Sequence, residues 1–243
     1  MSHSDHAPHF FATTRWTLVG HAAAGGGTHA VAALGELFAI YWQPLYRYAR
    51  RKGKSREDAE DLVQGFMARL IENDSLRHPD RSKGRFRTFL LASFNHWMIN
   101  EWRRGSREKR GGGHSTVSFD WQHAESGLSL EPADPRSPDL LYDREWALTL
   151  LETTLARLEK ICHGEGGASV FDTLKPCLTA DTARISYPEL SASLGVGEGA
   201  ARVAVHRLRK RYRHLLKEEI SRTLGDPAQT DEEIRALFAT LIG

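Results

Sequence analysis

The chain has 243 residues, of which 40% are hydrophobic and 26% charged, and its formal net charge is +2 at pH 7. This composition is typical of a soluble globular protein with one large or two small domains. No stretch approaches the roughly 20 apolar residues of a membrane span, and the first nine residues lack the apolar core of a signal peptide. The two cysteines exclude a disulfide framework. We therefore expect a cytoplasmic protein without a membrane partner.

Helical periodicity begins soon after an N-terminal tail, residues 1–13, which we expect to be disordered. Apolar residues recur at three- and four-residue spacing between residues 30 and 52 and form one buried face. They are Leu34, Leu37, Phe38, Tyr41, Leu45 and Tyr48. Pro44 lies inside this segment, and we expect it to kink or interrupt the helix. This helix opens a first domain that we expect to cover residues 14–110.

Two further helices are expected in the first domain. Ser55 stands at an N-cap position and predicts the start of the second helix. A polar loop, residues 73–84, then leads to a third helical run from Phe86 to about Arg110. Three glycines, residues 111–113, are expected to end this run.

The middle of the chain, residues 111–140, shows no helical period and contains three prolines among Ser, Gly and acidic residues. This pattern is typical of a linker. Periodicity resumes at Leu141 and runs to about Glu159, and after a Gly-rich break another helix ends near Cys177. The expected fold class is all-α. Two small helical domains, residues 14–110 and 141–222, are joined by a flexible linker and extended by a C-terminal helical segment, residues 223–243.

Residues 187–202 have the pattern of a helix-turn-helix. A short helix is closed by Gly195, a tight turn follows, and a longer helix runs from about Ala200 to Ser221. An apolar stripe of this helix is expected to face the core, and it consists of Ala201, Val205, Leu208, Tyr212 and Leu215. No acidic residue occurs between Arg202 and Lys217.

Such a basic helix suits the major groove of DNA, with its first residues at base edges and its later arginines at phosphates. We assign base reading to Glu198 and Arg202. Phosphate contacts are assigned mainly to Arg207, Arg209, Lys210 and Arg213. The alternative is a solvated basic helix without a nucleic-acid role.

The segment from Arg81 to Arg110 interleaves basic and aromatic side chains. A single-stranded nucleic-acid site needs this combination, because the charges follow the backbone and the rings stack on unpaired bases. The alternative is that the rings belong to a core, and the spacing favours it for Phe86, Phe89, Leu90 and Phe94. A second group is harder to assign to a core, and we expect at least one of its members to be exposed: Asn95, His96, Trp97, Asn100 and Trp102.

The second helix carries the opposite charge. Glu57, Asp58, Glu60 and Asp61 lie near its start, where they would repel DNA. A favourable interaction with the helix dipole explains the first two charges. Asp61 and Gln64 lie further along, on one exposed face, and suit contacts with a basic protein partner.

These three segments, in this order, resemble the sigma-70 family of bacterial RNA polymerase sigma factors and, within it, the extracytoplasmic-function (ECF) subfamily. The segment DAEDLVQGF, residues 58–66, resembles region 2.2, which docks on the β′ coiled coil of core polymerase. The segment FRTFLLASFN, residues 86–95, with the basic stretch after it, resembles regions 2.3 and 2.4, which melt and capture the −10 element. The helix-turn-helix resembles region 4.2, which reads the −35 element.

The resemblance covers roughly Thr14 to Ile220. Three further segments resemble one subgroup of these factors, namely TRWTLV at residues 14–19, KRGGG at residues 109–113 and VHRLRKRY at residues 205–212. The linker, which is acidic at Asp120, Glu125, Glu131, Asp134 and Asp139, would then thread the polymerase channels.

The resemblance implies a sigma factor that binds the β′ and β subunits of core polymerase and directs promoter-specific initiation. It implies a monomer when free, located in the cytoplasm and at the nucleoid through polymerase, with no catalytic activity and no cofactor. An anti-sigma factor is compatible with it and is not identified by it. The residues implied for core binding are Asp58, Glu60, Asp61 and Gln64. Those for −10 DNA are Arg87, Asn95, His96, Trp97, Asn100, Trp102, Arg103 and Arg104. Those for −35 DNA are Glu198, Gly199, Arg202, His206, Arg207, Arg209, Lys210 and Arg213.

Two positions depart from the family pattern. Gly65 stands where many members have an acidic residue, and it weakens the helix by about 1 kcal/mol relative to Ala. A residue this small permits a close approach by the partner. Val203, Ala204 and Val205 replace the commoner Ser-Arg-Leu, so an arginine that is often used on DNA is absent.

The sequence gives little support for a metal site or a catalytic site. The N-terminal residues His3, His6 and His9 are typical of a flexible end, and Cys162, His163 and Cys177 lack a fourth ligand and zinc-site spacing. No phosphate-binding loop or catalytic set is evident, so we expect no enzyme and no metal.

The C-terminal helix is expected to start after Thr230 and to place Ile234, Leu237, Phe238, Leu241 and Ile242 on one apolar face. It either caps the second domain's core or packs on the helix-turn-helix or a partner and tunes DNA access. The competing functions for the whole chain are a helix-turn-helix regulator that binds duplex DNA without joining polymerase, and a helical adaptor for acidic partners.

Overall fold

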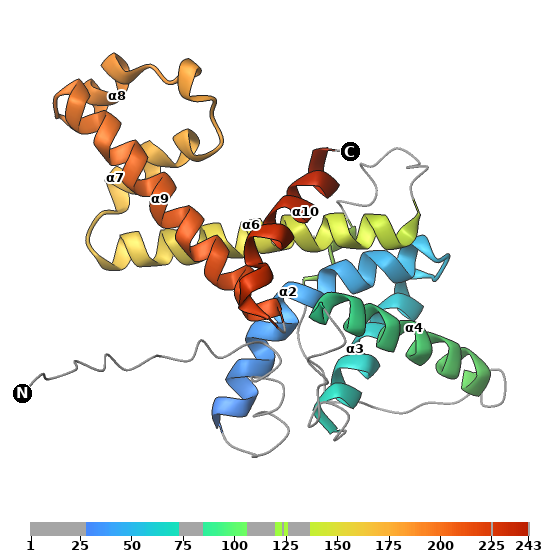
Figure 1. Ribbon diagram of the computed structural model, residues 1–243. Coiled ribbons are helices and arrows are strands. Elements are labelled where there is room, and N and C mark those ends of the chain that lie inside the picture. Colours follow the sequence, from blue (N-terminus) through green and yellow to red (C-terminus); the bar gives the residue numbers. More distant parts are fainter. Residues whose placement is uncertain are drawn as a thin grey trace, which may run out of the picture. The chain divides into compact units, whose positions relative to one another are not determined.

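The structure is a computed structural model, and it describes residues 28–72, 85–105, 120–122, 124, 125, 137–224 and 226–242. All regular structure in these ranges is helical (Figure 1), which confirms the expected all-α class. The α-helices are α2 (Thr28–Arg51), α3 (Arg56–Glu72), α4 (Phe86–Gly105), α6 (Pro138–Gly164), α7 (Ala168–Leu174), α8 (Tyr187–Leu194), α9 (Glu198–Thr223) and α10 (Thr230–Ile242). No helix in the described ranges has both the length and the apolarity needed to cross a membrane.

The chain divides into two compact units. The first unit comprises Met1–Asp134 and Ser221–Thr230, and the second comprises Pro135–Ile220 and Asp231–Gly243. The expected tail, residues 1–13, and the subgroup segments at residues 14–19 and 109–113 lie outside the described residues.

The core of the first unit is formed by α2, α3 and α4. Tyr41 of α2 meets Phe86 of α4 edge to face with the ring centroids 5.3 Å apart, and Phe66 of α3 meets Phe94 of α4 at 5.1 Å. Such ring pairs add to the stabilisation that comes from burial of apolar area. The buried residues include Leu45, Tyr48, Ala59, Val63, Leu70, Leu90 and Met98, so most of the predicted apolar faces are core.

The helix boundaries of the first unit follow local rules with one exception. Ser55 caps α3, because its Oγ accepts a hydrogen bond from the Asp58 backbone N–H at 3.0 Å. Pro44 does not interrupt α2, which continues through it to Arg51. The side chain of Pro44 is buried.

The second unit contains α8 and α9, which cover the residues of the predicted helix-turn-helix. Gly195 ends α8 with φ +65° and ψ 31°, a left-handed conformation that glycine adopts without the steric cost of a Cβ. The predicted stripe of α9 faces inward, with Ala201, Val205, Leu208 and Leu215 buried and Tyr212 partly buried. This stripe packs with residues of α6, α7 and α8, among them Leu158, Phe171, Leu174 and Leu190.

The segment expected to be a linker, residues 111–140, contains structured parts. Its end is the start of α6, where the Ser137 Oγ accepts from the Leu140 backbone N–H at 3.4 Å and Pro138 occupies the first turn. α6 therefore begins three residues before the predicted Leu141, and it continues to Gly164, beyond the predicted Glu159. Residues 121, 122, 124 and 125 are helical and belong to the first unit.

The C-terminal helix α10 belongs to the second unit from Asp231 onward. Leu237 and Glu233 are buried, while Phe238 and Ile242 are exposed. A small apolar pocket lies between α6, α9 and α10, and it is lined by Ala147, Leu150, Leu151, Leu216, Ile220, Ile234, Leu237, Phe238 and Leu241. α10 thus packs on the C-terminal half of α9 and on α6.

Candidate functional site

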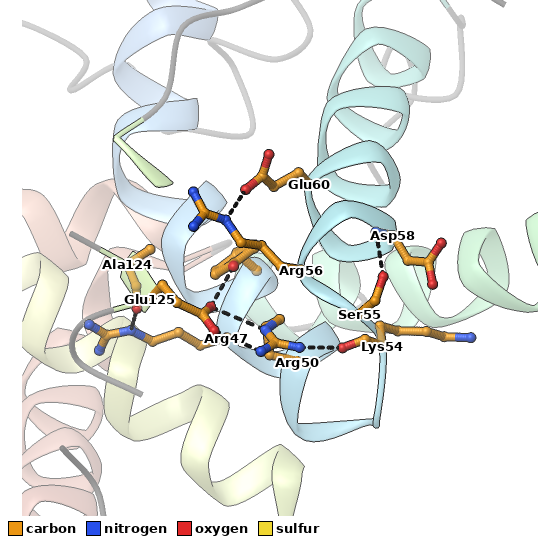
Figure 2. A network of polar contacts seen from close by, with 10 residues as sticks. Arg47, Arg50, Lys54, Ser55, Arg56, Asp58, Glu60, Ala124 and Glu125 are labelled. Atoms are coloured by element: carbon orange, nitrogen blue, oxygen red, sulfur yellow. Dashed lines mark hydrogen bonds and ion pairs between the residues drawn. The ribbon is translucent and has the colours of Figure 1, made fainter. Parts of the chain in front are cut away.

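The acidic face of α3 is the first candidate surface. Asp58 and Asp61 are exposed, and Gln64 is partly exposed. The Glu60 carboxylate is less accessible to a partner, because its Oε1 accepts a hydrogen bond from the Arg56 Nε at 2.8 Å in an i,i+4 ion pair (Figure 2). Exposed pairs of this kind contribute little to stability. The structure therefore brings all four predicted partner-binding residues to one helix, with Asp58 and Asp61 the most accessible.

Gly65 lies under the indole ring of Trp97. A Cβ built at Gly65 would be 3.0 Å from Cζ2 of Trp97, so no side chain fits there without displacing the ring. The indole is fixed in this place, because its Nε1–H donates to the Leu62 carbonyl at 3.0 Å and the Arg69 guanidinium lies 5.4 Å from the ring centroid. The close approach that we expected from an external partner is made by Trp97 of the same unit.

The predicted −10 residues separate into internal and exposed groups. Arg87 is only 2% exposed and forms interactions inside the protein, so its guanidinium is not a surface cation in this structure. Asn95 is partly buried, and its Oδ1 accepts from the Tyr48 Oη at 3.0 Å, which ties α4 to α2. Trp97 packs on α3, as described above. The side chains of Trp102 and Arg104 lie outside the described part of the structure.

Three predicted residues do reach the surface of α4. His96, Asn100 and Arg103 are exposed, and their spacing places them on one side of the helix. Ile99 lies on the same side and is 48% exposed, which is unusual for a residue of this size and polarity. Ile99 was not among the residues predicted from the sequence, although its i+3 position relative to His96 places it on the same side of the helix.

The exposed side of α9 forms the second candidate surface. Arg202, His206, Arg207, Lys210 and Arg213 are all exposed, as are Glu198 and Gly199. Val203 lies among them with 47% of its surface exposed. Two cations of this side have contacts that leave them accessible. The Arg202 guanidinium lies 3.9 Å from the centroid of the Tyr187 ring, and the Arg213 Nε donates to the Arg209 carbonyl at 3.3 Å.

Arg209 has a different role from its neighbours. Its Nε donates to the Cys177 carbonyl at 2.9 Å, its Nη1 to the Thr182 Oγ1 at 2.7 Å and its Nη2 to the Ala180 carbonyl at 2.5 Å. The planar guanidinium thereby holds the connection between α7 and α8 against α9. Arg209 thus has a positioning role inside the second unit that uses three of its five N–H donors, and its phosphate contact stays a prediction.

Two ion pairs brace the other side of α9. Both terminal nitrogens of Arg211 bind the Glu165 carboxylate, at 2.7 and 2.5 Å, and this contact holds the pKa of Glu165 below its ordinary value. Arg157 of α6 binds the buried Glu219 at 2.7 Å. The cations Arg157, Arg209 and Arg211 are therefore committed to the fold, which leaves the side with Arg207 and Lys210 for a partner.

Three possible metal ligands meet on the surface of the second unit. One ligand atom from each of Glu159, His163 and Asp172 lies within 4.8 Å of the others. Glu159 already binds Lys175 at 3.2 Å, and His163 and Asp172 are exposed. These contacts are those of a surface ion-pair cluster. Cys162 and Cys177 are buried free thiols, and burial raises the pKa of both.

The regular structure in the described ranges is helical, with an acidic face on α3 in one unit and a basic face on α9 in the other. Residues 37–108, which include most of α2 and all of α3 and α4, match the family model of sigma-70 region 2. This part of the chain is therefore similar to sigma-70 region 2, and the match covers less than half of the 243 residues. Searches of curated proteins and of solved structures found no match.

Proposed function

We propose that the chain is an ECF-type sigma factor that binds core RNA polymerase and directs promoter-specific transcription initiation. The observation that carries the proposal is the match of residues 37–108 to sigma-70 region 2. Members of this family act in transcription initiation without catalysing a reaction themselves. The proposed protein is a cytoplasmic monomer when free and contacts the β′ and β subunits as well as promoter DNA.

Core polymerase binding is assigned to the exposed side of α3. Asp58 and Asp61 offer exposed carboxylates to a basic partner, and Gln64 lies beside them on the same side of the helix. Glu60 contributes through its pair with Arg56. Charges arranged in this way mainly determine which partner binds and how fast it associates.

The −10 element is assigned to α4. His96, Asn100 and Arg103 supply polar and cationic contacts to an opened strand, and Ile99 supplies an apolar surface among them. Asn95 and Trp97 support this face from behind, by holding α4 to α2 and to α3.

The −35 element is assigned to the exposed side of α9. Arg202 and Glu198 lie in the first turns, where a recognition helix reads base edges, and Arg207, Lys210 and Arg213 follow at positions suited to phosphates. Val203 lies between these groups and suits an apolar contact with a thymine methyl group. We propose that this contact replaces the arginine that the family often has in this part of the helix.

Transcription in vitro tests the proposal as a whole. The purified chain is added to core polymerase on a library of random upstream sequences, and the transcripts are sequenced. The proposal predicts initiation from promoters that share two motifs, one at each element. If the chain neither co-purifies with core nor produces promoter-specific transcripts, it is not a sigma factor.

A charge reversal tests the polymerase-binding face. Asp61→Arg is expected to abolish co-elution with core polymerase, because it places a cation against a basic partner. Binding of duplex −35 DNA in a gel-shift assay is expected to be unchanged. Glu232→Arg is the matched control, since Glu232 is an exposed acidic residue in the first turn of α10. Equal loss of core binding in both variants would contradict the assignment of the α3 face.

The alternative is a helix-turn-helix regulator that binds duplex DNA and does not join polymerase. The basic side of α9 fits this reading equally well, whereas the region 2 match and the acidic side of α3 do not. Duplex binding without any core binding would favour the alternative.

A further inference from the structure

A short part of the expected linker is packed on α2 of the first unit. We define the docked segment as residues 120–122, 124 and 125. The Trp121 ring meets Trp42 edge to face at 5.1 Å between centroids, and its centroid lies 5.2 Å from that of Tyr46. Ala124 is fully buried. The sequence predicted a flexible linker here, whereas the structure shows side chains packed against a helix.

Arg50 joins the docked segment to the corner between α2 and α3. Its Nη2 and Nε donate to the Glu125 carboxylate at 2.7 and 3.1 Å, and its Nη1 donates to the Lys54 carbonyl at 2.6 Å (Figure 2). Bidentate pairs of this kind are strong and geometrically specific. One guanidinium therefore holds a carboxylate of the docked segment and, at the same time, the residue directly before the N-cap of α3.

The corner between the two helices is short and hydrogen-bonded. The Gly53 N–H donates to the Arg50 carbonyl at 3.0 Å, and the Lys54 N–H donates to the Ala49 carbonyl at 3.2 Å. These are the two hydrogen bonds of a Schellman motif, which ends α2. Because only residues 52–55 lie between the helices, the position of the Lys54 carbonyl determines where the first turn of α3 lies.

The same network balances the charges beside the acidic side of α3. Arg50 and Arg56 are cations near the start of this helix, where they would oppose a basic partner. Arg50 is paired with Glu125 and Arg56 with Glu60. The hydrogen bond to Glu60 raises the pKa of Arg56, and the charge of Glu125 acts in the same direction. With the segment docked, a carboxylate therefore compensates each cation.

We propose that the docked segment positions the start of α3 for core polymerase and keeps its binding side acidic, with Glu125 and Arg50 as the positioning residues. This inference rests on the proposed function, in which the acidic side of α3 binds core polymerase. Undocking releases Arg50 from Glu125, loosens the corner before α3 and leaves Arg50 and Arg56 with less compensating charge. Both changes weaken the binding of a basic partner. Glu125 thus acts through Arg50 and not as a free acidic residue of the linker.

The first experiment tests the corner in the full-length free protein by hydrogen exchange and mass spectrometry. The amides of Lys54, Asp58 and Ala59 are hydrogen-bonded in the corner and the first turn of α3. Glu125→Ala is expected to speed their exchange and to leave the amides of α4 unchanged. Gln122→Ala is the matched control, since Gln122 is exposed in the docked segment. Unchanged exchange of the three amides in Glu125→Ala would overturn the inference.

The second experiment measures the affinity of each variant for core polymerase. Glu125→Ala and Arg50→Ala are each expected to weaken binding about fivefold, and the double variant about as much as either one, because Glu125 acts through Arg50. Asp139→Ala is the control, since Asp139 is an exposed acidic residue outside the docked segment, and it is expected to bind normally. Losses that multiply to about 25-fold in the double variant would show that the two residues act independently, which contradicts the inference.

The salt dependence separates this role from a general loss of stability. The ratio of the affinities of the unaltered protein and Glu125→Ala is expected to shrink as the salt concentration rises, because salt screens the uncompensated cations. A ratio that is the same at every salt concentration indicates a merely structural effect and contradicts the inference.

The failure of the inference and the failure of the proposed function give different results. Equal or tighter binding of core polymerase by Glu125→Ala refutes the inference and leaves the sigma-factor proposal intact. Absence of core binding by the unaltered protein refutes the proposed function and the inference with it.

Discussion

Arg207 and Arg209 are two residues apart on α9 and have different roles. Arg207 is exposed, whereas Arg209 places three hydrogen bonds on Cys177, Ala180 and Thr182. Both lie in the same basic stretch of the sequence, so the pattern of charges predicted a DNA contact for each. The two residues are distinguished only by the fold, in which the α7–α8 connection contacts Arg209.

The first prediction compares these two arginines. Arg209→Ala is expected to lower the free energy of unfolding by about 2 kcal/mol, because it removes charged hydrogen bonds that hold the connection in place. Arg207→Ala is expected to change stability by less than about 0.5 kcal/mol and to reduce the salt dependence of duplex binding by about one unit of slope. Urea unfolding and salt titration of DNA affinity measure the two effects. Equal destabilisation by both substitutions would contradict the positioning role.

Gly65 departs from the family pattern, and the side chains around it explain this departure. Its absent side chain looks like a weak point of α3, yet the Trp97 ring occupies the space that a side chain would need. The cost to helix propensity is therefore offset by a packed indole with a satisfied N–H.

The second prediction follows from that packing. Gly65→Leu is expected to destabilise the first unit by about 1–3 kcal/mol, since the added side chain has to displace an indole that is held by a hydrogen bond. In the double variant with Trp97→Ala, the cost of Gly65→Leu is expected to shrink. A double-mutant cycle by thermal unfolding measures this coupling, and additive effects would show that the two residues do not compete for the same space.

At the scale of the helix, α10 was predicted from the sequence, but the helices on which it packs were not. Its apolar face was predicted correctly for Leu237, while Phe238 and Ile242 are exposed. The helix lies on the C-terminal half of α9 and on α6, and a Lys217–Asp231 ion pair of 2.6 Å braces its first turn. It therefore takes part in the core of the second unit, and its influence on promoter output remains a proposal.

The third prediction separates stability from surface effects in α10. Leu237→Ala is expected to lower the free energy of unfolding of the second unit by about 2 kcal/mol or more, because it enlarges an existing apolar pocket. Ile242→Ala is the control, since that side chain is 86% exposed. Chemical unfolding measures both, and a large effect of Ile242→Ala would indicate a partner for the exposed end of the helix.

At the scale of the whole molecule, part of the expected linker is docked on α2 of the first unit, where the Glu125 carboxylate accepts hydrogen bonds from Arg50 and Tyr46. Its hydrogen bonds from Arg50 hold the pKa of Glu125 below the ordinary value, and those from Tyr46 act in the same direction. A carboxylate whose pKa is lower when docked stabilises docking above the ordinary carboxyl pKa of about 4.3 and loses that contribution as the pH falls.

The fourth prediction is therefore an acid dependence of docking. Hydrogen-exchange protection of Ala124 is expected to be constant near pH 7 and to decline as the pH falls below about 4.3, after correction for the intrinsic exchange rate. In Glu125→Gln the protection at pH 7 is expected to be lower and to lack this titration. The same acid titration in both proteins would show that another group controls docking.

The sequence by itself determined the helical class, the N-cap at Ser55 and the end of α8 at Gly195, because helical period and capping depend on residues within one or two turns. Tertiary structure decided which charged and aromatic residues are left for a partner. Arg209 binds a carbonyl 32 positions away, Trp97 one 35 positions away and Glu125 a guanidinium 75 positions away. A local pattern cannot contain contacts of that separation, so these three side chains looked like surface groups until the fold brought their partners to them.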